Sequence, residues 1–265
     1  LMDGDACTKC GRCTDACPAD TVGRNLDPRN VILDLKAYRE SVSDDPVAGS
    51  GGGTGSMATD GGTVPIVADE GGVVDAESME SCLSCMACMD ACPVDIEHLT
   101  SFTKMNRQLV DEGAVDSNLQ SVFQDVMQKG NTFGESQANR GDWTDDLDGV
   151  EVPDARETEV EYLWYVGDYP SFDDRNKKVA RALARLFDEA DVSFGILFDD
   201  EKTDGNDIRR IGEEFLYLEL AGHHVETFAD CEFESIVCTD PHSYNTIENE
   251  YPEVDFAEFA DDPMM

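Results

Sequence analysis

Eight of the ten cysteines fall in two runs of identical spacing, and in each run a proline follows the last cysteine. The runs are Cys7-x2-Cys10-x2-Cys13-x3-Cys17-Pro18 and Cys82-x2-Cys85-x2-Cys88-x3-Cys92-Pro93. Three thiolates two residues apart on a tight loop can hold three corners of an iron–sulfur cubane. The fourth cysteine lies too far along an emerging helix to reach the same cube comfortably. This spacing is typical of [4Fe–4S] sites and predicts two such clusters.

The ligand sets follow by analogy with other two-cluster proteins, in which the fourth cysteine of each run ligates the other cluster. This exchange would tie the two runs together despite the long segment between them. Pro18 and Pro93 would disrupt a helix just after the fourth cysteine. The predicted sets are Cys7, Cys10, Cys13 and Cys92 for one cluster, and Cys82, Cys85, Cys88 and Cys17 for the other.

Two other uses of cysteine fit this pattern less well. Zinc sites need four ligands per ion and usually show paired Cys-x2-Cys arms. Disulfides are unexpected in a chain without a visible export signal. Two neighbouring [4Fe–4S] clusters have one usual task, the movement of single electrons. Neither a nucleophile–base pair nor a phosphate-binding glycine motif is visible, so a self-contained active site is not indicated.

The elements around the two runs are expected to be helical. Asp27 can cap a helix over residues 27–42, and apolar residues recur at helical spacing in 94–112 and 117–129. We therefore expect a dicluster domain formed by residues 1–45 and 78–135. Residues 46–77 are rich in glycine and are expected to be a flexible insert. Residues 136–155 are expected to be a linker.

The pattern changes to alternating strands and helices in residues 156–265. Strands are expected at 162–166, 192–198, 225–228 and 236–239, with helices at 173–190, 206–221 and after Pro241. This alternation predicts an α/β domain with a parallel sheet. Ligands of such sheets bind beyond the carboxyl ends of the strands, here the loops 167–173, 199–206 and 239–244. His223 and His224 are expected at a helix end, where an imidazolium is favoured.

The charge balance excludes some classes of partner. The chain has 19 basic and 58 acidic residues, a net charge of −39. Nucleic acid and anionic lipid surfaces would repel such a protein. The acids are spread along the chain, which favours the salt-rich cytoplasm of a halophile over an ordinary protein with one acidic tail.

The sequence contains no apolar run long enough to span a bilayer. It opens with Leu1 and quickly reaches Cys7, which suggests a fragment of a longer polypeptide. We expect a cytoplasmic location, with membrane association through a missing N-terminal segment or a partner as the alternative.

Beyond the cysteine runs, four segments resemble iron–sulfur subunits of the heterodisulfide reductase type. They are CPVDIEHLTSFTKMNRQLV, GNTFG, VGDYPSFDDRNKKVARALARLF and IVCTDPHSYNTIENEYP. Relatives in that family include the iron–sulfur subunits of glycolate oxidase, of anaerobic glycerol-3-phosphate dehydrogenase and of lactate-utilisation complexes. The resemblance covers nearly the whole chain except residues 46–77. It implies a helical two-cluster ferredoxin domain followed by a partial cysteine-rich "CCG" domain.

The second half departs from that family where a cofactor would be held. The family's cysteines after the first and second strands correspond to Asp168 and Thr203, and its Cys-Pro-His-Cys corresponds to residues 240–243, with Asp240 and Ser243 in the cysteine positions. One interpretation is a scaffold that has lost its cofactor and docks a partner. The other is an oxygen-ligated site for a further metal or unusual cluster, built from Asp168, Asp240 and either His242 or Cys238. Asp240 has a simpler role as a helix cap.

The resemblance implies an electron-transfer subunit that relays electrons between a flavin dehydrogenase and a quinone or disulfide. It would be one part of an oxidoreductase and not an enzyme by itself. Two alternatives stay open: a reductase with its own site at Asp168 and Asp240, and a structural or redox-sensing subunit.

Overall fold

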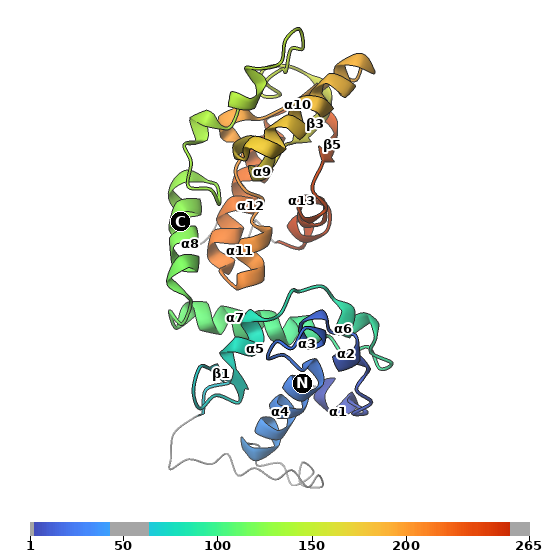
Figure 1. The fold of residues 1–265 in the computed structure, drawn as a ribbon, viewed down its shortest axis with the longest axis vertical. Coiled ribbons are helices and arrows are strands. Elements are labelled where there is room, and N and C mark those ends of the chain that lie inside the picture. Colours follow the sequence, from blue (N-terminus) through green and yellow to red (C-terminus); the bar gives the residue numbers. More distant parts are fainter. Residues whose placement is uncertain (1–2, 43–63, 255–265) are drawn as a thin grey trace. The chain divides into compact units, whose positions relative to one another are not determined.

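The computed structural model describes residues 3–42 and 64–254, which form two compact units (Figure 1). The first unit comprises Leu1–Val115 with Arg210–Gly212, and the second Asp116–Arg209 with Glu213–Met265. This boundary lies 20 residues before the expected one, 135 − 115, because the helix over 117–129 groups with the second half.

The first unit is mainly helical, with one very short parallel strand pair. Val67 pairs with Val74, and Ala68 with Asp75. Its elements are α1 Asp3–Ala6, α2 Arg12–Asp15, α3 Pro18–Thr21, α4 Pro28–Val42, β1 Val67–Ala68, β2 Val74–Asp75, α5 Ala76–Glu80, α6 Ala87–Asp90 and α7 His98–Asp111. The helices expected at 27–42 and 94–112 are therefore present as α4 and α7.

The end of the expected insert is part of the core of this unit. Val67 is fully buried, and Val73 and Val74 pack in the same apolar cluster as Phe102 and Met105 of α7. Gly72 is needed here because a side chain would bring its Cβ within 2.6 Å of the Ala68 backbone nitrogen. Residues 64–77 are therefore packed into the core through their apolar side chains, despite the glycines among them, and do not form a flexible coil. Residues 46–63 of the expected insert lie outside the described residues.

The second unit is built on a three-stranded parallel sheet with the order β4-β3-β5. Its strands are β3 Val160–Tyr165, β4 Phe194–Gly195 and β5 Phe233–Cys238. The α-helices are α8 Ser117–Lys129, α9 Asp168–Phe172, α10 Asp174–Glu189, α11 Asn206–Ile211, α12 Glu214–Ala229 and α13 Pro241–Asn245. Short helical turns complete it: η1 Gln137–Asn139, η2 Asp142–Thr144, η3 Phe198–Asp200, η4 Thr246–Glu250 and η5 Tyr251–Glu253. The parallel sheet expected from the sequence is thus present.

Two predicted features of this unit are wrong in detail. The stretch 225–228, expected as a strand, belongs to α12, because the face formed by Leu216, Leu220 and His224 continues at helical spacing to Phe228, which stacks on His224. The stretch 192–198 contributes only the two-residue strand β4, followed by an isolated bridge between Asp154 and Ile196.

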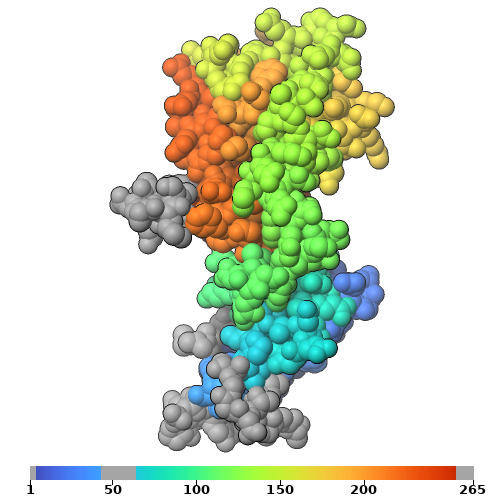
Figure 2. All heavy atoms as spheres, turned by 90° about the vertical axis from the view of Figure 1, so that its left-hand side faces the viewer, coloured from blue at the N-terminus to red at the C-terminus, as the bar shows by residue number. Residues whose placement is uncertain are grey.

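Residues 136–155, expected as a linker, pack into the second unit. Trp143 is fully buried and meets Trp164 of β3 edge to face, with ring centroids 5.4 Å apart. Leu147 and Ala155 are also buried. Figure 2 shows this yellow-green segment lying against the rest of its unit. Burial of these apolar groups makes the segment part of the domain.

Candidate metal centre

Four cysteines from both runs surround one small cavity in the first unit. Cys7, Cys10 and Cys13 come from the first run, and Cys92 comes from the end of the second. The cavity is small, with a volume of about 20 Å³, and is partly open to solvent. The other lining residues are Thr8, Lys9, Gly11, Arg29, Pro93, Val94, Ile96 and His98. The structure therefore brings together the members of the first predicted ligand set.

The remaining four cysteines of the runs also lie near one another. Burial raises the pKa of Cys82, and the neighbouring thiols of Cys17 and Cys85 add to that shift. Burial, with the thiols of Cys82 and Cys85, raises the pKa of Cys88 to about 11. Cys17 is buried in the apolar core against which Cys82 packs. Metal binding by these thiols would release protons, because the ligand form is the thiolate.

The two cysteine loops share an unusual backbone conformation. Lys9 and Gly11 have positive φ angles of 58° and 83° in the first loop, and Ser84 and Met86 have angles of 51° and 63° in the second. These pairs occupy equivalent positions between the first three cysteines of each run. Only glycine adopts this region without cost, so three of the four positions hold strain of the kind found at ligand sites.

Backbone N–H groups point at several of the sulfur atoms. The amide of Ser84 donates to Sγ of Cys82 and that of Ile96 donates to Sγ of Cys92, both at 3.4 Å. The backbone amide of Arg12, together with Thr8, lowers the pKa of Cys10. Such N–H···S contacts favour a charged sulfur, which is the form that a metal cluster requires.

In residues 3–42 and 64–254, no group of three or more His, Cys, Asp and Glu side chains is placed to hold one metal ion. With zinc–sulfur bonds of about 2.3 Å, a tetrahedral zinc site would gather its sulfurs within about 3.8 Å of each other. All ten cysteines are free thiols. Four cysteines around a cavity fit a larger sulfur-liganded group, such as a cubane, better than zinc.

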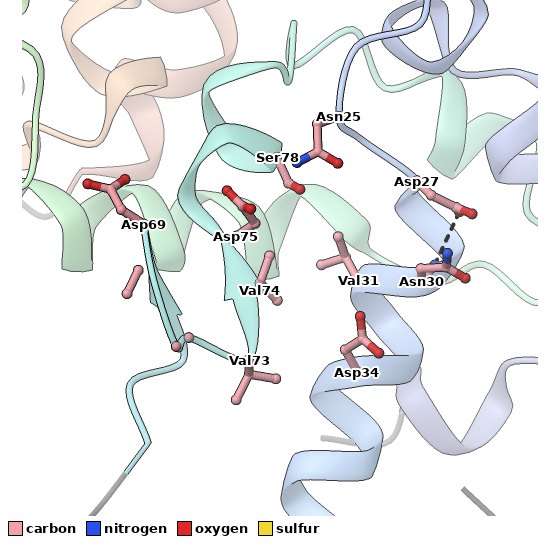
Figure 3. Close-up of a pocket in the computed structure, with 13 residues that line it drawn as sticks. Asn25, Asp27, Asn30, Val31, Asp34, Asp69, Val73, Val74, Asp75 and Ser78 are labelled. Carbon is pink, nitrogen blue, oxygen red and sulfur yellow. Dashed lines mark hydrogen bonds between the residues drawn. The ribbon is translucent and has the colours of Figure 1, made fainter. Parts of the chain in front are cut away.

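A different pocket of the first unit is lined by acids, amides and valines and contains no cysteine (Figure 3). Asp27, at its edge, already accepts hydrogen bonds from Thr14 and from the backbone of Asn30, and it pairs with Arg29 at 3.1 Å. Burial, together with the charge of Asp27, raises the pKa of Asp34. These carboxylates therefore have protein partners or a neighbouring like charge, and the cysteine sites are separate from this pocket.

In the second unit, Asp168 is held by an arginine that the sequence analysis missed. Its Oδ1 accepts from Nη2 of Arg140 at 2.6 Å, and its Oδ2 accepts from the backbone and the hydroxyl of Thr132 at 2.8 and 2.9 Å. Arg140 also donates to Glu201 at 2.9 Å. All three charged side chains are buried. No sequence pattern marks Arg140, which comes from the expected linker.

Glu201 closes this network against the sheet. It accepts hydrogen bonds from the backbone amides of Val166 and Gly167 at 2.9 and 2.8 Å, just beyond the end of β3. Burial raises the pKa of Glu201, and Arg140 and the two amides oppose that shift. The guanidinium therefore lies beside the carboxyl end of the central strand, the edge at which ligands of parallel sheets bind.

The other four tentative positions have mixed surroundings. The backbone amide of Thr203 donates to the carbonyl of Gly130 at 2.8 Å. Asp240 caps α13 by accepting from the amide of His242. Ser243 is buried and donates to a carboxylate oxygen of Asp204, another buried acid. Burial, with the charge of Asp204, raises the pKa of Cys238 to about 12. The structure thus brings Cys238 and Ser243 close to Asp204, while Asp240 has the capping role.

His224 differs from the sequence expectation, because it lies inside α12 and is fully buried. It stacks on Phe228 and Tyr251, and its Nε2 accepts from the amide of Lys202 at 3.2 Å. Burial lowers its pKa to about 3. The imidazole is therefore neutral and structural, and not the helix-end cation that was predicted.

Comparison with known proteins supports an iron–sulfur domain in the first unit. Residues 6–96 match the 4Fe-4S dicluster domain family. The chain is 34% identical to a probable iron-sulfur-binding oxidoreductase of Bacillus subtilis, over 97% of this chain and 40% of the relative. It is 38% identical to a probable membrane-anchored ferredoxin of Chromohalobacter salexigens, over 95% of this chain and 38% of the relative.

A third relative is the EtfAB:quinone oxidoreductase of Syntrophomonas wolfei, 34% identical over 96% of this chain and 37% of the relative. The chain therefore spans about two fifths of the length of each of these relatives. No solved structure gives a significant match. Within the described ranges, no helix combines the length and the apolar character needed to cross a bilayer. The protein thus carries a ferredoxin-type iron–sulfur domain at residues 6–96.

Proposed function

We propose that this chain is an electron-relay subunit of an oxidoreductase and carries two [4Fe–4S] clusters. Cys7, Cys10, Cys13 and Cys92 would hold one cluster, and Cys82, Cys85, Cys88 and Cys17 the other. The observation that carries this proposal is the cavity that three cysteines of the first run share with the last cysteine of the second. A cluster, when bound, supplies a site that accepts and releases one electron at a time.

The chain's own residues would prepare these sites and leave them accessible. The backbone amides of Ser84 and Ile96 donate to the sulfurs of Cys82 and Cys92, which stabilises the negative charge of a liganded cluster. Cys10 and Cys85 are exposed, one in each loop. Each cluster would therefore approach the protein surface at one ligand, where a partner could exchange electrons with it.

We infer the partners from the resemblance and from the names of the relatives. One relative is named for EtfAB and quinone, and another as membrane-anchored. These names support an electron path from a flavin dehydrogenase to a quinone-reactive membrane component, with a disulfide as the alternative acceptor. We also retain the relation to the heterodisulfide reductase type, the halophilic origin and the cytoplasmic location as parts of this proposal.

Counting iron and acid-labile sulfide under anaerobic conditions, with EPR of the reduced protein, tests the number of clusters. About eight iron atoms per chain are expected for two cubanes. A Cys231→Ser variant is the matched control, because Cys231 lies outside both runs and should leave the count unchanged. A count near four, or sulfide well below iron, would contradict the proposal.

Paired serine substitutions test which cysteines share a cluster. With exchanged fourth ligands, Cys7→Ser with Cys92→Ser damages one cluster and spares the other, whereas Cys7→Ser with Cys17→Ser damages both. If each run held its own cluster, the two results would be reversed. EPR of each double variant counts the intact clusters that remain.

For the second unit we propose a scaffold without a metal. The carboxylate of Asp168 already accepts hydrogen bonds from Arg140 and Thr132, and that of Asp240 accepts one from the first turn of α13. These contacts favour a scaffold over a reductase with its own metal site. An Asp168→Asn variant should keep the iron content of the parent protein. Iron beyond that of two cubanes, lost in Asp168→Asn, would favour the reductase instead. Clusters that no low-potential reductant can cycle would favour a structural or sensing subunit.

A further inference from the structure

The two cysteine runs allow the surroundings of the two proposed clusters to be compared position by position. The second run repeats the first 75 residues later, 82 − 7. Acidic residues occur at equivalent positions two residues before the first cysteine, two after the third and three after the fourth. The equivalent pairs are Asp5 and Glu80, Asp15 and Asp90, and Asp20 and Asp95. The acidic charge of the two runs is therefore matched.

The basic charge of the two loops is not matched. Lys9 of the first loop corresponds to Ser84 of the second, and Arg12 corresponds to Ala87. The backbone is the same at the first of these positions, with φ angles of 58° at Lys9 and 51° at Ser84. Lys9 lines the cavity that the first ligand set surrounds. The first loop thus carries two cations that the second loop lacks.

Arg29 adds a third cation on the same side. It lines the cavity of Cys7, Cys10, Cys13 and Cys92, and its Nη1 lies 3.6 Å from the position that a Cβ on Gly11 would occupy. Its pairing with Asp27 at 3.1 Å offsets part of its charge. Arg12 lies outside the cavity lining, but its backbone amide and its charge act on Cys10, whose pKa they lower. The excess of positive charge around this cavity therefore rests mainly on Lys9 and Arg12, with Arg29 as a weaker contributor.

Positive charge near an iron–sulfur cluster favours its reduced form, because reduction adds negative charge to a group that is already anionic. We propose that Lys9, Arg12 and Arg29 give the cluster of Cys7, Cys10, Cys13 and Cys92 the higher reduction potential of the two. This inference rests on the proposed two-cluster function and gives the relay a direction. One electron leaves the cluster of the second loop, which is oxidised, and enters the cluster of the first loop, which is reduced. No bond forms or breaks, and a flavin dehydrogenase and a quinone or disulfide are the external donor and acceptor.

An anaerobic redox titration of the full chain, followed by EPR, tests this order. The parent protein should show two midpoints. Lys9→Ser with Arg12→Ala replaces the two cations of the first loop by the residues that the second loop has at these positions. It should lower the higher midpoint while leaving the lower one in place. At a fixed applied potential, the ratio of reduced to oxidised first cluster should fall about threefold or more, where tenfold corresponds to 59 mV.

The reverse exchange keeps the proposal testable if the first variant loses a cluster. Ser84→Lys with Ala87→Arg should raise the lower midpoint, and the left-handed backbone at position 84 accepts lysine as it does at Lys9. Lys104→Gln is the matched control, because it removes one positive charge from α7 outside the cavity lining and should move the two midpoints equally or not at all.

Salt gives a further test of the same charges. Lys9 and Arg12 are exposed, so 1 M KCl should screen them and narrow the gap between the two midpoints.

Several outcomes would overturn the assignment. If Lys9→Ser with Arg12→Ala shifts the lower midpoint, the first cluster has the lower potential and the proposed order is reversed. If neither exchange moves a midpoint, the charges do not set the order of the two potentials. These failures differ from a failure of the proposed function. A protein with about eight iron atoms and two reducible clusters retains the relay even where the charges do not set its direction.

Discussion

At the scale of single residues, the polar groups near the sheet end are tightly partnered. Asp204 is buried, accepts from the hydroxyl of Ser243, and accepts from the backbone amide of Asn206 at 2.7 Å. The hydroxyl of Tyr251 donates to the backbone carbonyl of Asp204 at 2.9 Å. These contacts connect the loop before α11 with the segment after β5. Asp204 therefore takes part in holding the unit together, although no motif singles it out.

The charge of Asp204 makes stability depend on pH. Burial raises its pKa from 3.8 to about 6, so the folded protein binds this proton more tightly than the unfolded chain does. The resulting stabilisation is complete below about pH 4 and is lost as the pH rises through about 6, a loss of about 3 kcal/mol. Asp204→Asn should abolish this loss and be more stable than the parent at pH 8.

The measurement is chemical unfolding at pH 5 and pH 8, followed by tryptophan fluorescence. Both tryptophans, Trp143 and Trp164, lie in the second unit, so this signal reports on it. Asp148→Asn is a control because that acid is exposed and is not among the groups that shift the pKa of Asp204. An unchanged difference between the two pH values in Asp204→Asn would assign the pH dependence to other groups.

At the scale of elements, Arg140 joins three parts of the second unit. It comes from the segment between α8 and β3, and it contacts Asp168 at the start of α9 and Glu201 after η3. The loops after neighbouring parallel strands are thereby fixed by one internal cation. Removing one member of such a buried set is costly because the remaining charges stay in a poorly solvated place.

Arg140→Met should lower the unfolding free energy of the second unit by about 3–5 kcal/mol. Arg156→Met is the matched control, because Arg156 also pairs with acids but is partly exposed, so its loss should cost less than about 1 kcal/mol. Combining Arg140→Met with Asp168→Asn and Glu201→Gln should recover part of the loss. Equal effects of the two single variants in denaturant unfolding would refute the special role of Arg140.

At the scale of the whole molecule, the dominant property is the net charge of −39. Repulsion between like charges opposes compact structure in dilute salt. Its range shrinks from about 10 Å at 0.1 M salt to about 3 Å at 1 M. A protein with this charge is therefore expected to be more stable where salt is concentrated, as in the proposed halophilic cytoplasm.

The unfolding midpoint should rise steadily when KCl is raised from 0.1 M to 2 M. A variant with Glu157→Gln, Glu159→Gln and Glu226→Gln replaces three exposed acids by amides and should depend less on salt. Thermal unfolding in a KCl series measures both proteins. A midpoint that does not respond to salt, or the same slope in the variant, would remove the argument for salt adaptation.

The sequence determined the features that depend on local spacing. The two cysteine runs predicted an iron–sulfur domain, and residues 6–96 match a 4Fe-4S dicluster family. The helix expected at 173–190 is present, and Asp173 caps it by accepting from the amides of Arg175 and Asn176. Helical and strand periods predicted α4, α7, α8 and the parallel sheet. These signals are readable because they arise between residues that are near one another in the chain.

Other features depended on contacts between distant parts of the chain, which only the tertiary structure decided. Arg140 meets Glu201 across 61 residues of sequence, and neither residue belongs to a recognisable pattern. Val67 and Trp143 come from segments that composition marks as insert and linker, yet both are fully buried. Burial and pairing are set by what packs against a residue, and a single sequence records its own side chains but not which of them will become neighbours.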